Sequence, residues 1–350
     1  MPQKGKTGEK PVTIKSIAQE LGISFSTVAK ALNNNPSIKQ ETRELVLSKA
    51  QEMGYTPNTL AKGLRGSSTK TISVIFNDIE NPMLTYIFRN ISIEMSKYGY
   101  TTIILDSQFS ETIERNNILT VLSRQPDFII LEPASTNMDN LSLLEGYESK
   151  LILQGARYES VNCHHVTIDY AQGGYLAASE LLSKHHRDCL VITEPLSFPI
   201  SEQFIQGIQR AYAEYGLTLS EDRIFTTHSS ITNGFQTIMK LWNEETKSFT
   251  LPFTGVMTFD DHIAHGVYKA AAHLNLSVPN DISVIGFDDN PLSAFSMPPL
   301  STIHLPNEKM AESCIQILHK VLLEHQTTTC LFSLEPYFVG RGSVAELSRP

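Results

Sequence analysis

The segment from Thr13 to Leu32 constrains the fold of this 350-residue chain more than any other, because two short apolar repeats meet there at a glycine. Gly22 tolerates the positive φ of a tight turn, and Ser24 is a suitable N-cap for a helix that follows it. The apolar residues recur at helical spacing and are Ile14, Ile17, Ala18 and Leu21, then Val28, Ala29 and Leu32. The pattern predicts helices over about 13–21 and 24–31, with a third over 40–53.

The outward side of the second predicted helix carries Phe25, Ser26, Thr27 and Lys30. Hydroxyls and a cation of this kind suit base edges and phosphates. Two helices joined by a tight turn, with such an outer side, are typical of a helix-turn-helix whose second helix lies in the major groove of DNA. For these twenty residues alone, a small helical hairpin with a solvated outer face is the alternative.

The sequence from 13 to 66 resembles the DNA-binding headpiece of the lactose-repressor (LacI/GalR) family through TIKSIA, GISFSTV, TRELV and GYTPNTLAKGL. The resemblance implies a DNA-binding domain over 12–57, preceded by a polar, Lys-rich and disordered stretch over 1–11. It implies that Phe25, Ser26 and Lys30 read base edges. Residues expected near phosphates are Thr13, Thr27, Asn33, Ser37 and Thr42, and the rest of the DNA interface is Ser24, Tyr55, Asn58, Ala61 and Leu64.

We expect residues 58–68 to form a hinge or a linker. Asn58 would cap a short helix over 59–64 that ends before Gly66, and an isolated helix of this length is marginal in water. The resemblance implies that this helix folds on DNA and that Leu64 wedges into the minor groove. A flexible linker is the alternative in the absence of DNA.

Charge is distributed unevenly along the chain. The whole chain has a net charge of −9, but residues 1–70 hold 11 Lys and Arg against 5 Asp and Glu, a net charge of +6, which leaves −15 for the remainder. This charge asymmetry orients the basic N-terminal part toward a polyanion such as DNA. The affinity for that polyanion should fall steeply with salt.

The composition of the chain narrows the classes of protein to which it can belong. At 41% hydrophobic residues, the chain can bury a large core in two or three domains. It contains no apolar run of membrane-spanning length and no secretory signal, so we expect a cytoplasmic protein with no membrane partner. The cysteines and histidines at 163–165, 262 and 265 lack complete ligand spacing, and we expect neither a metal nor a cofactor.

Beyond Thr69, buried apolar runs alternate with amphipathic segments. The runs are TISVIF, YTTIILD, DFIILEP, LILQG, HVTID, CLVITE, GVMTFDD and ISVIGFDD. They predict an α/β fold with parallel, doubly wound sheets, in which ligands bind outside the carboxyl ends of the strands. Polar residues stand at those ends: Asn77, Asp78, Asp106, Glu132, Gln154, Asp169, Asp260, Asp261, Asp288 and Asp289.

The same region resembles the two-lobed, type I periplasmic-binding-protein-like core of the lactose-repressor family. The resemblance rests on NPML, DYAQGGYLA, FDDHIAHGV, DISVIGFDD, PPLSTI and RGS. It implies an effector-binding and dimerisation core over 69–346. Lobe one would take about 70–167 and 303–327, and lobe two about 168–302 and 328–346, with an effector cleft between them.

By this resemblance, Met83 and Leu84 pack on the effector and Asp288 accepts hydrogen bonds from its hydroxyls. Asp260 stands where the family usually has Asn. Phe204 stands where many members place an Arg, and an aromatic ring there could stack on a sugar or base but not hydrogen-bond to it. Arg157 could substitute, or form a surface ion pair. The expected effector-binding residues are Asn77, Met83, Leu84, Asp106, Glu132, Phe204, Asp260 and Asp288.

These patterns predict a transcriptional regulator, a repressor, that binds a palindromic operator as a homodimer under the control of a sugar or sugar derivative. The C-terminal ELSRP carries no leucine heptad, so we expect dimers rather than tetramers joined by a coiled-coil tail. A solute-binding protein or an enzyme on the same two-lobed fold is the alternative. The paired carboxylates at 260–261 and 288–289 lack a nucleophile motif, which favours recognition of hydroxyls over catalysis.

Overall fold

The computed structural model describes residues 12–55, 68–134 and 138–348. The chain divides into a small unit within residues 1–67 and a large unit over 68–350. The N-terminal stretch over 1–11 and the predicted hinge helix, with Asn58, Ala61 and Leu64, lie outside the described residues.

The small unit contains three helices, α1 (Ile14–Leu21), α2 (Phe25–Leu32) and α3 (Gln40–Glu52), and confirms the three predicted helices. Thr13 and Ser16 form a capping box at the start of α1, and Gly22 ends that helix at a φ of 64°. The Ser24 side chain accepts a hydrogen bond from the N–H of Thr27 (3.1 Å) and so begins α2. The helices share one buried core of Ile17, Ala18, Val28, Ala31, Val46 and Ala50.

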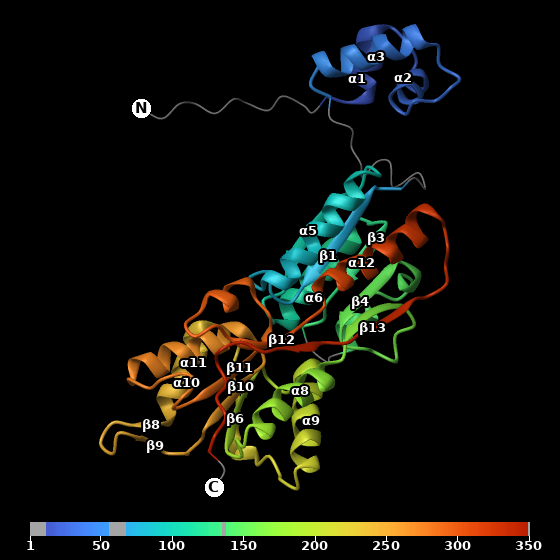
Figure 1. Cartoon of the computed structure of the whole chain (residues 1–350). Helices are drawn as coiled ribbons and strands as arrows, with labels where there is room; N and C mark the ends of the chain where they lie inside the picture. The colour runs from blue at the N-terminus through green and yellow to red at the C-terminus, as the bar shows by residue number, and fades with distance from the viewer. Residues whose placement is uncertain (1–11, 56–67, 135–137, 349–350) are drawn as a thin grey trace, which may run out of the picture. The chain divides into compact units, whose positions relative to one another are not determined.

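The large unit contains two six-stranded sheets (Figure 1). The first is parallel throughout, in the order β13 (Leu331–Leu334), β5 (His164–Ile168), β4 (Leu151–Gly155), β3 (Phe128–Leu131), β1 (Thr71–Phe76) and β2 (Thr101–Asp106). The second follows the order β14 (Tyr337–Val339), β12 (Ser301–His304), β11 (Ser283–Asp288), β10 (Gly255–Thr258), β6 (Cys189–Thr193) and β7 (Ile224–Thr226). Only β14 runs antiparallel to its neighbour in this sheet. The predicted parallel α/β fold is confirmed.

Helices cover both sheets and give two lobes (Figure 1). The helices of lobe one are α5 (Pro82–Ser96), α6 (Glu111–Ser123), α7 (Met138–Ser142) and α12 (Asn307–Leu318), and those of lobe two are α8 (Tyr170–Ser183), α9 (Pro199–Glu214), α10 (Ile231–Leu241) and α11 (Asp261–His273). Lobe two also carries the short hairpin of β8 (Trp242–Asn243) and β9 (Ser248–Phe249). In the described parts of the chain, no helix is long and apolar enough to cross a membrane.

The chain passes between the lobes three times within residues 138–348: after β5, after β12, and between β13 and β14. The third passage differs from the predicted boundary, which assigned all of 328–346 to lobe two. Strand β13 pairs with β5 in lobe one, where the N–H of His165 donates to the carbonyl of Cys330 (3.0 Å) and that of Asp169 to Leu334 (3.0 Å). A four-residue edge strand carries too little pattern to indicate which of two sheet edges it joins.

Helices α8 and α9 approach each other closely because glycines stand at their contact. A Cβ on Gly207 would lie 1.8 Å from the carbonyl oxygen of Ala171, and one on Gly174 would lie 2.1 Å from that of Phe204. Both helices begin at the edge of the second sheet where polar residues gather, so this packing positions Tyr170 and Ile200.

We therefore expect Gly207→Ala to lower the free energy of unfolding. In a helix without a close neighbour, Gly→Ala stabilises the protein by about 1 kcal/mol. At a close helix contact the added methyl group overpacks the interface, which costs about 1–3 kcal/mol. The sign of the change in the free energy of unfolding therefore shows whether α8 and α9 are in close contact. Ala213 is exposed on the same helix, and Ala213→Ser serves as the control that should change little. Denaturant unfolding of both variants measures the difference, and a stabilised Gly207→Ala protein would contradict the packing.

Candidate functional site

The outer side of α2 presents Phe25, Ser26 and Lys30 to solvent, and the Phe25 residue is 40% exposed. Thr27 is half-buried, and its hydroxyl lies 2.8 Å from that of Ser24. Of these two predicted DNA-contacting hydroxyls, that of Ser24 also caps the helix and that of Thr27 is bonded to it. Their other hydrogen-bonding positions face outward at the start of α2, where the helix dipole favours an anion such as a phosphate.

The residues flanking α2 are held by local hydrogen bonds. Asn33 follows the end of α2 and is exposed, and the N–H of Ser37 donates to the Asn35 side chain (2.9 Å). Arg43, on α3, donates to the backbone carbonyls of Asn35 (3.0 Å) and Ile38 (3.4 Å) and holds this loop. Arg43 lies in the TRELV motif, but its contact with the loop is not evident from the sequence.

The remaining predicted DNA contacts of the small unit lie at its periphery. Thr13 is exposed at the start of α1, and Thr42 is half-buried in the first turn of α3. Tyr55 packs against the small core, so it has a structural role besides any contact with DNA. Exposed Lys15 and Lys39 add positive charge to that of Lys30.

In the large unit, a cleft lies between the lobes at the carboxyl ends of β1, β3, β6, β10 and β11, with about 410 Å³ of space that is partly open to solvent. Lobe one contributes Asn77, Asp78, Asn81, Met83, Leu84, Phe109 and Glu132. Lobe two contributes Tyr170, Glu194, Ile200, Ser229, Phe259, Asp260 and Asp288. The polar strand ends therefore meet, as the parallel sheets predict.

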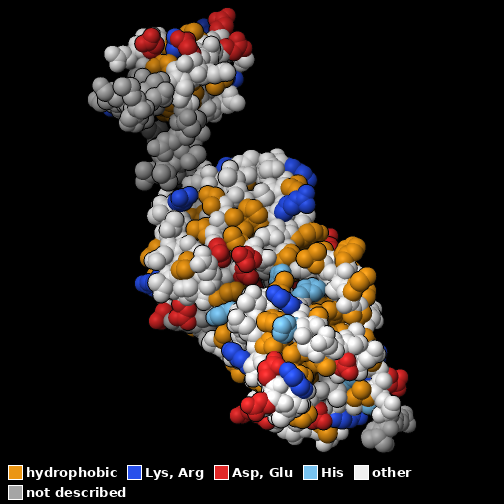
Figure 2. Space-filling view, turned by 90° about the vertical axis from the view of Figure 1, so that its left-hand side faces the viewer, with side chains coloured by type: hydrophobic (Ala, Val, Ile, Leu, Met, Phe, Trp, Pro, Cys, Tyr) orange, Lys and Arg blue, Asp and Glu red, His pale blue; other side chains and the backbone are white. Residues whose placement is uncertain are grey.

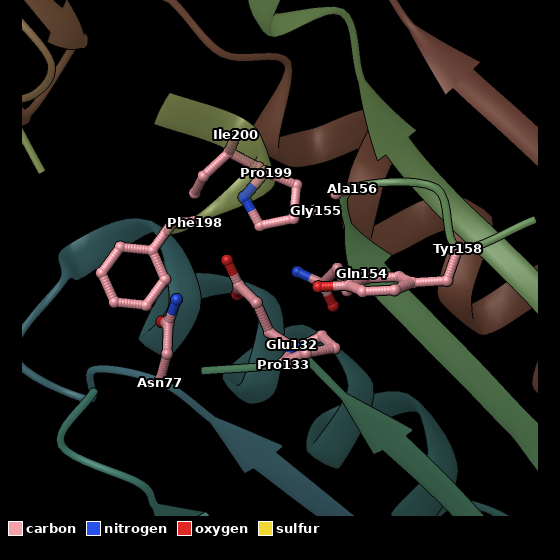
Figure 3. A pocket seen from close by; sticks show the side chains of 10 residues that line it. All are labelled: Asn77, Glu132, Pro133, Gln154, Gly155, Ala156, Tyr158, Phe198, Pro199 and Ile200. Atoms are coloured by element: carbon pink, nitrogen blue, oxygen red, sulfur yellow. The ribbon is translucent and has the colours of Figure 1, made fainter. Parts of the chain in front are cut away.

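A second hollow adjoins this cleft and shares Asn77, Glu132 and Ile200 with it. Figure 3 shows the Glu132 carboxyl pointing into the hollow from lobe one, with the Gln154 amide facing it and Phe198 and Pro199 of lobe two beside it. Gly155 lies beside this carboxyl at a φ of 84°, a backbone conformation that glycine adopts without strain.

The two adjacent carboxylates of the FDD motif have different roles. Asp260 caps α11, because its Oδ1 accepts a hydrogen bond from the N–H of Ile263 (2.7 Å), and it lines the cleft. Asp261 lies in the protein interior and accepts from the N–H of Asn290 (2.7 Å) and from the hydroxyls of Ser293 (2.6 Å) and Thr302 (2.7 Å). Asp261 thus holds β12 and the loop after β11, whereas Asp260 faces the ligand space.

Burial dominates the electrostatics of the cleft. It raises the pKa of Glu132 to about 8, with the charge of Asp78 adding to the shift. The pKa values of Glu194 and Asp288 are raised well above the usual range by desolvation first and by neighbouring carboxylates second. Desolvation also raises the pKa values of Asp78 and Asp260. The five carboxyls therefore favour the protonated form more than exposed carboxyls do.

Six of the eight expected effector-binding residues line the cleft: Asn77, Met83, Leu84, Glu132, Asp260 and Asp288. Asp106 does not. Its carboxylate accepts a hydrogen bond from the N–H of Gln108 (3.1 Å) in the loop after β2. Arg157 forms an exposed ion pair with Glu159 (3.8 Å), which was the alternative to a cleft role.

The expected stacking role of Phe204 is wrong in this structure. The side chain is fully buried on α9, and its ring packs edge-on against Phe259 and Phe287, with centroid distances of 5.3 Å to each. Phe204 supports Phe259, which does line the cleft. Phe204 lies in the core rather than in the cleft because its side of α9 packs against α8 and the second sheet.

Sequence reasoning missed several lining residues. Glu194 ends the run CLVITE as Glu132 ends FIILE, so the signal was present. Asn81 and Tyr170 stand in the NPML and DYAQGGYLA motifs, and Phe259 begins FDD, but none of the three was assigned to the cleft. Phe109, Ile200 and Ser229 come from loops and a helix start, whose approach to the cleft has no sequence signature. Phe109 also joins the lobes, since its ring lies 5.6 Å from that of Phe198 and 5.8 Å from that of His228.

Comparison with known protein families gives two matches. Residues 13–58 match the model described as bacterial regulatory proteins, lacI family, and residues 178–344 match the periplasmic binding protein-like domain. Catabolite control protein A of Priestia megaterium is 29% identical over 92% of this chain and 96% of its own length.

Two solved structures share the fold. One, described as the Lac repressor dimer bound to operator and the anti-inducer ONPF, has a TM-score of 0.76 at 21% identity and covers 96% of this chain and 100% of its own. The other, the transcriptional regulator CelR-cellobiose complex, has a TM-score of 0.69 at 19% identity. It covers 95% of this chain and 99% of its own.

The raised pKa of Glu132 predicts a pH-dependent stability. A carboxyl with a folded-state pKa of about 8, above an ordinary value of 4.5, contributes stability below pH 4.5 that is lost as the pH rises through 8. Glu132→Gln stays neutral, so its free energy of unfolding should fall less between pH 5.5 and 8.5, by a difference on the order of a few kcal/mol.

Denaturant unfolding at several pH values measures this difference. Glu159→Gln, at an exposed position of the same lobe, is the matched control and should retain the pH dependence of the unaltered protein. Parallel curves for Glu132→Gln and the unaltered protein would contradict the desolvation of Glu132.

Proposed function

Because the chain belongs to the lacI family of bacterial regulatory proteins and carries a periplasmic-binding-protein-like effector domain, we propose that it binds a palindromic operator as a homodimer under the control of a cleft-bound effector. The protein is a helix-turn-helix transcriptional repressor and not an enzyme. We propose that it acts on operator DNA in the cytoplasm.

The observation that carries the proposal is the exposed polar and cationic side of α2 on a packed three-helix unit. Phe25, Ser26 and Lys30 read base edges in the major groove. Thr13, Thr27, Asn33, Ser37 and Thr42 lie near phosphates and fix the orientation of α2, and Ser24, Tyr55, Asn58 and Ala61 complete the interface. We expect Leu64, which lies outside the described residues, to wedge into the minor groove at the centre of the operator.

The effector binds between the lobes and changes their closure. Phe109 of lobe one touches Phe198 and His228 of lobe two, so opening of the cleft separates these rings. A ligand that favours one degree of closure shifts operator affinity by a coupling of about 1–3 kcal/mol. Carboxylates in the cleft accept hydrogen bonds from hydroxyls, which supports a sugar or sugar derivative, and one structure of the same fold is a cellobiose complex.

Dimer formation through the effector lobes would present two small units to successive half-sites. Three large apolar residues after β11 support an interface between copies of the chain: Leu292 is 64% exposed, Phe295 83% and Met297 93%. Figure 2 shows hydrophobic side chains gathered in patches on the face of the large unit that it draws. Exposed apolar surface of this kind is usually covered by a partner.

We expect the double substitution of Ser26→Ala with Lys30→Ala to relax operator discrimination, because each lost base contact removes about 1–3 kcal/mol of preference for the correct base. Selection of bound sequences from a random duplex library measures it. Lys15→Ala, on α1, is the control. It should weaken binding to all sequences alike, if it has any effect. An unchanged sequence preference in the double variant would refute the assignment of α2 as the recognition helix.

Phe295→Ser with Met297→Ser should shift the protein from dimer to monomer at micromolar concentration, because the substitutions remove apolar area that the partner covers. Light scattering after gel filtration measures the mass. Leu119→Ser removes an exposed leucine of α6 and should leave the mass unchanged. If the double variant remains a dimer, this patch is not the interface.

A further inference from the structure

The charge of the cleft is more one-sided than recognition of a neutral ligand requires. Five carboxyls line it, two from lobe one and three from lobe two: Asp78, Glu132, Glu194, Asp260 and Asp288. No Lys or Arg belongs to the lining among the described residues. Two histidines adjoin the lining: His262 lies near Asp78 and Asp260, and His228 contacts Phe109. A phosphate or carboxylate on the effector would face like charges here.

A second, independent feature is two buried carboxyl oxygens without a partner on residues that line this space. Within the described residues, Oε2 of Glu132 and Oδ2 of Asp260 have no hydrogen-bond partner, although these residues are only 5% and 4% exposed. Figure 3 shows the Glu132 carboxyl directed into the hollow that adjoins the cleft, where the Nε2 atom of Gln154 also lacks a partner. A buried carboxyl oxygen without a partner is unfavourable, and a donor that ionises the carboxyl would pair it.

We propose that the effector carries a protonated amine beside its hydroxyls, as an amino sugar does, and that this ammonium binds between Glu132, Asp260 and Asp288. The proposal rests on the effector-binding function proposed above and adds the ligand's chemical class. An ammonium offers three donors and a positive charge, whereas a hydroxyl offers one donor and no charge. Phe109 and Phe259 add aromatic surface against which a cation or a sugar ring packs.

The protonation state of the cleft distinguishes an ammonium from a neutral sugar. Without ligand, burial and mutual repulsion keep the carboxyl pKa values raised, so part of the cluster holds protons near neutral pH. A bound ammonium stabilises the ionised carboxylates and lowers those pKa values, so protons leave the site as the amine enters. Amine affinity therefore rises with pH as the carboxyls ionise, up to the pKa of the ligand's own amine, while a neutral sugar shows no such rise.

Charged and titratable groups line or adjoin the cleft from both lobes. They are Asp78, Asp106 and Glu132 from lobe one, and Tyr170, Glu194, His228, Asp260, Asp261, His262, Asp288 and Asp289 from lobe two. Asp289 is already paired with His304 and Arg341, and Asp261 accepts three hydrogen bonds, so neither is available to an ammonium.

Calorimetric titration of the full chain tests the proposal. The probes are glucosamine and galactosamine, with glucose, galactose and N-acetylglucosamine as neutral counterparts and glucosamine 6-phosphate as an anionic one. Putrescine is the probe that carries amines but no hydroxyls. We expect an amino sugar to bind at least about tenfold more tightly than its neutral counterpart, and titrations in two buffers of different ionisation enthalpy should show proton release on binding.

If putrescine binds more tightly than either amino sugar, the ammonium site stands, and the effector is an aliphatic amine rather than an amino sugar. Equal or tighter binding of a neutral or phosphorylated sugar, binding of amines without proton release, or no binding of any amine would each overturn the proposal.

Two isosteric variants locate the ammonium. Glu132→Gln and Asp288→Asn should each weaken amino-sugar binding by about tenfold or more and reduce the linked proton release, because each removes a potential charge at the site. Exposed Glu159→Gln is the control and should bind as the unaltered protein does. Circular dichroism and operator binding without ligand confirm that each variant is folded. Variants that are folded yet bind the amine unchanged would overturn the assignment of these residues.

Operator binding in the presence of each probe separates the two proposals. If a specific duplex is preferred and a neutral sugar changes that affinity while amines do not, the amine proposal fails and the regulatory function stands. If no duplex is preferred over random sequence, with or without any probe, the proposed function itself fails.

Discussion

Parallel strand pairing is the constraint on which the site of this protein depends. Within each sheet the parallel strands, all except β14, end at one edge. Residues that follow β1, β3, β6, β10 and β11 therefore come together although up to about 210 positions separate them in sequence. The three passages of the chain between lobes bring the two edges face to face across one cleft.

That convergence has an electrostatic cost. Carboxyls that would be solvated on separate strands become crowded and desolvated, and their pKa values rise for this reason. Repulsion among them opposes closure of the lobes, while contacts such as that between Phe109 and Phe198 favour it. A ligand that neutralises the carboxyls shifts this balance, which gives effector binding a physical route to the arrangement of the lobes.

In the small unit the relation between sequence and structure is more local. The capping box of Thr13, the left-handed Gly22 and the N-cap Ser24 each act within three residues, and the apolar spacing of both helices specifies their buried sides. The ends of the three helices were accordingly predictable to within a residue or two. The contact of Arg43 with the loop carbonyls was not, because it depends on how α3 docks.

The sequence by itself determined the elements and the chemistry of the site: apolar runs specify parallel strands, and the polar residues that end them specify carboxyls at a cleft. Only the tertiary structure decided which side chains face that cleft. It buried Phe204 under Phe259, turned Asp261 inward while Asp260 faces the ligand space, and joined β13 to lobe one. The reason is that periodicity specifies which side of an element is buried, whereas the neighbour on that side depends on helix docking and on the passages between lobes.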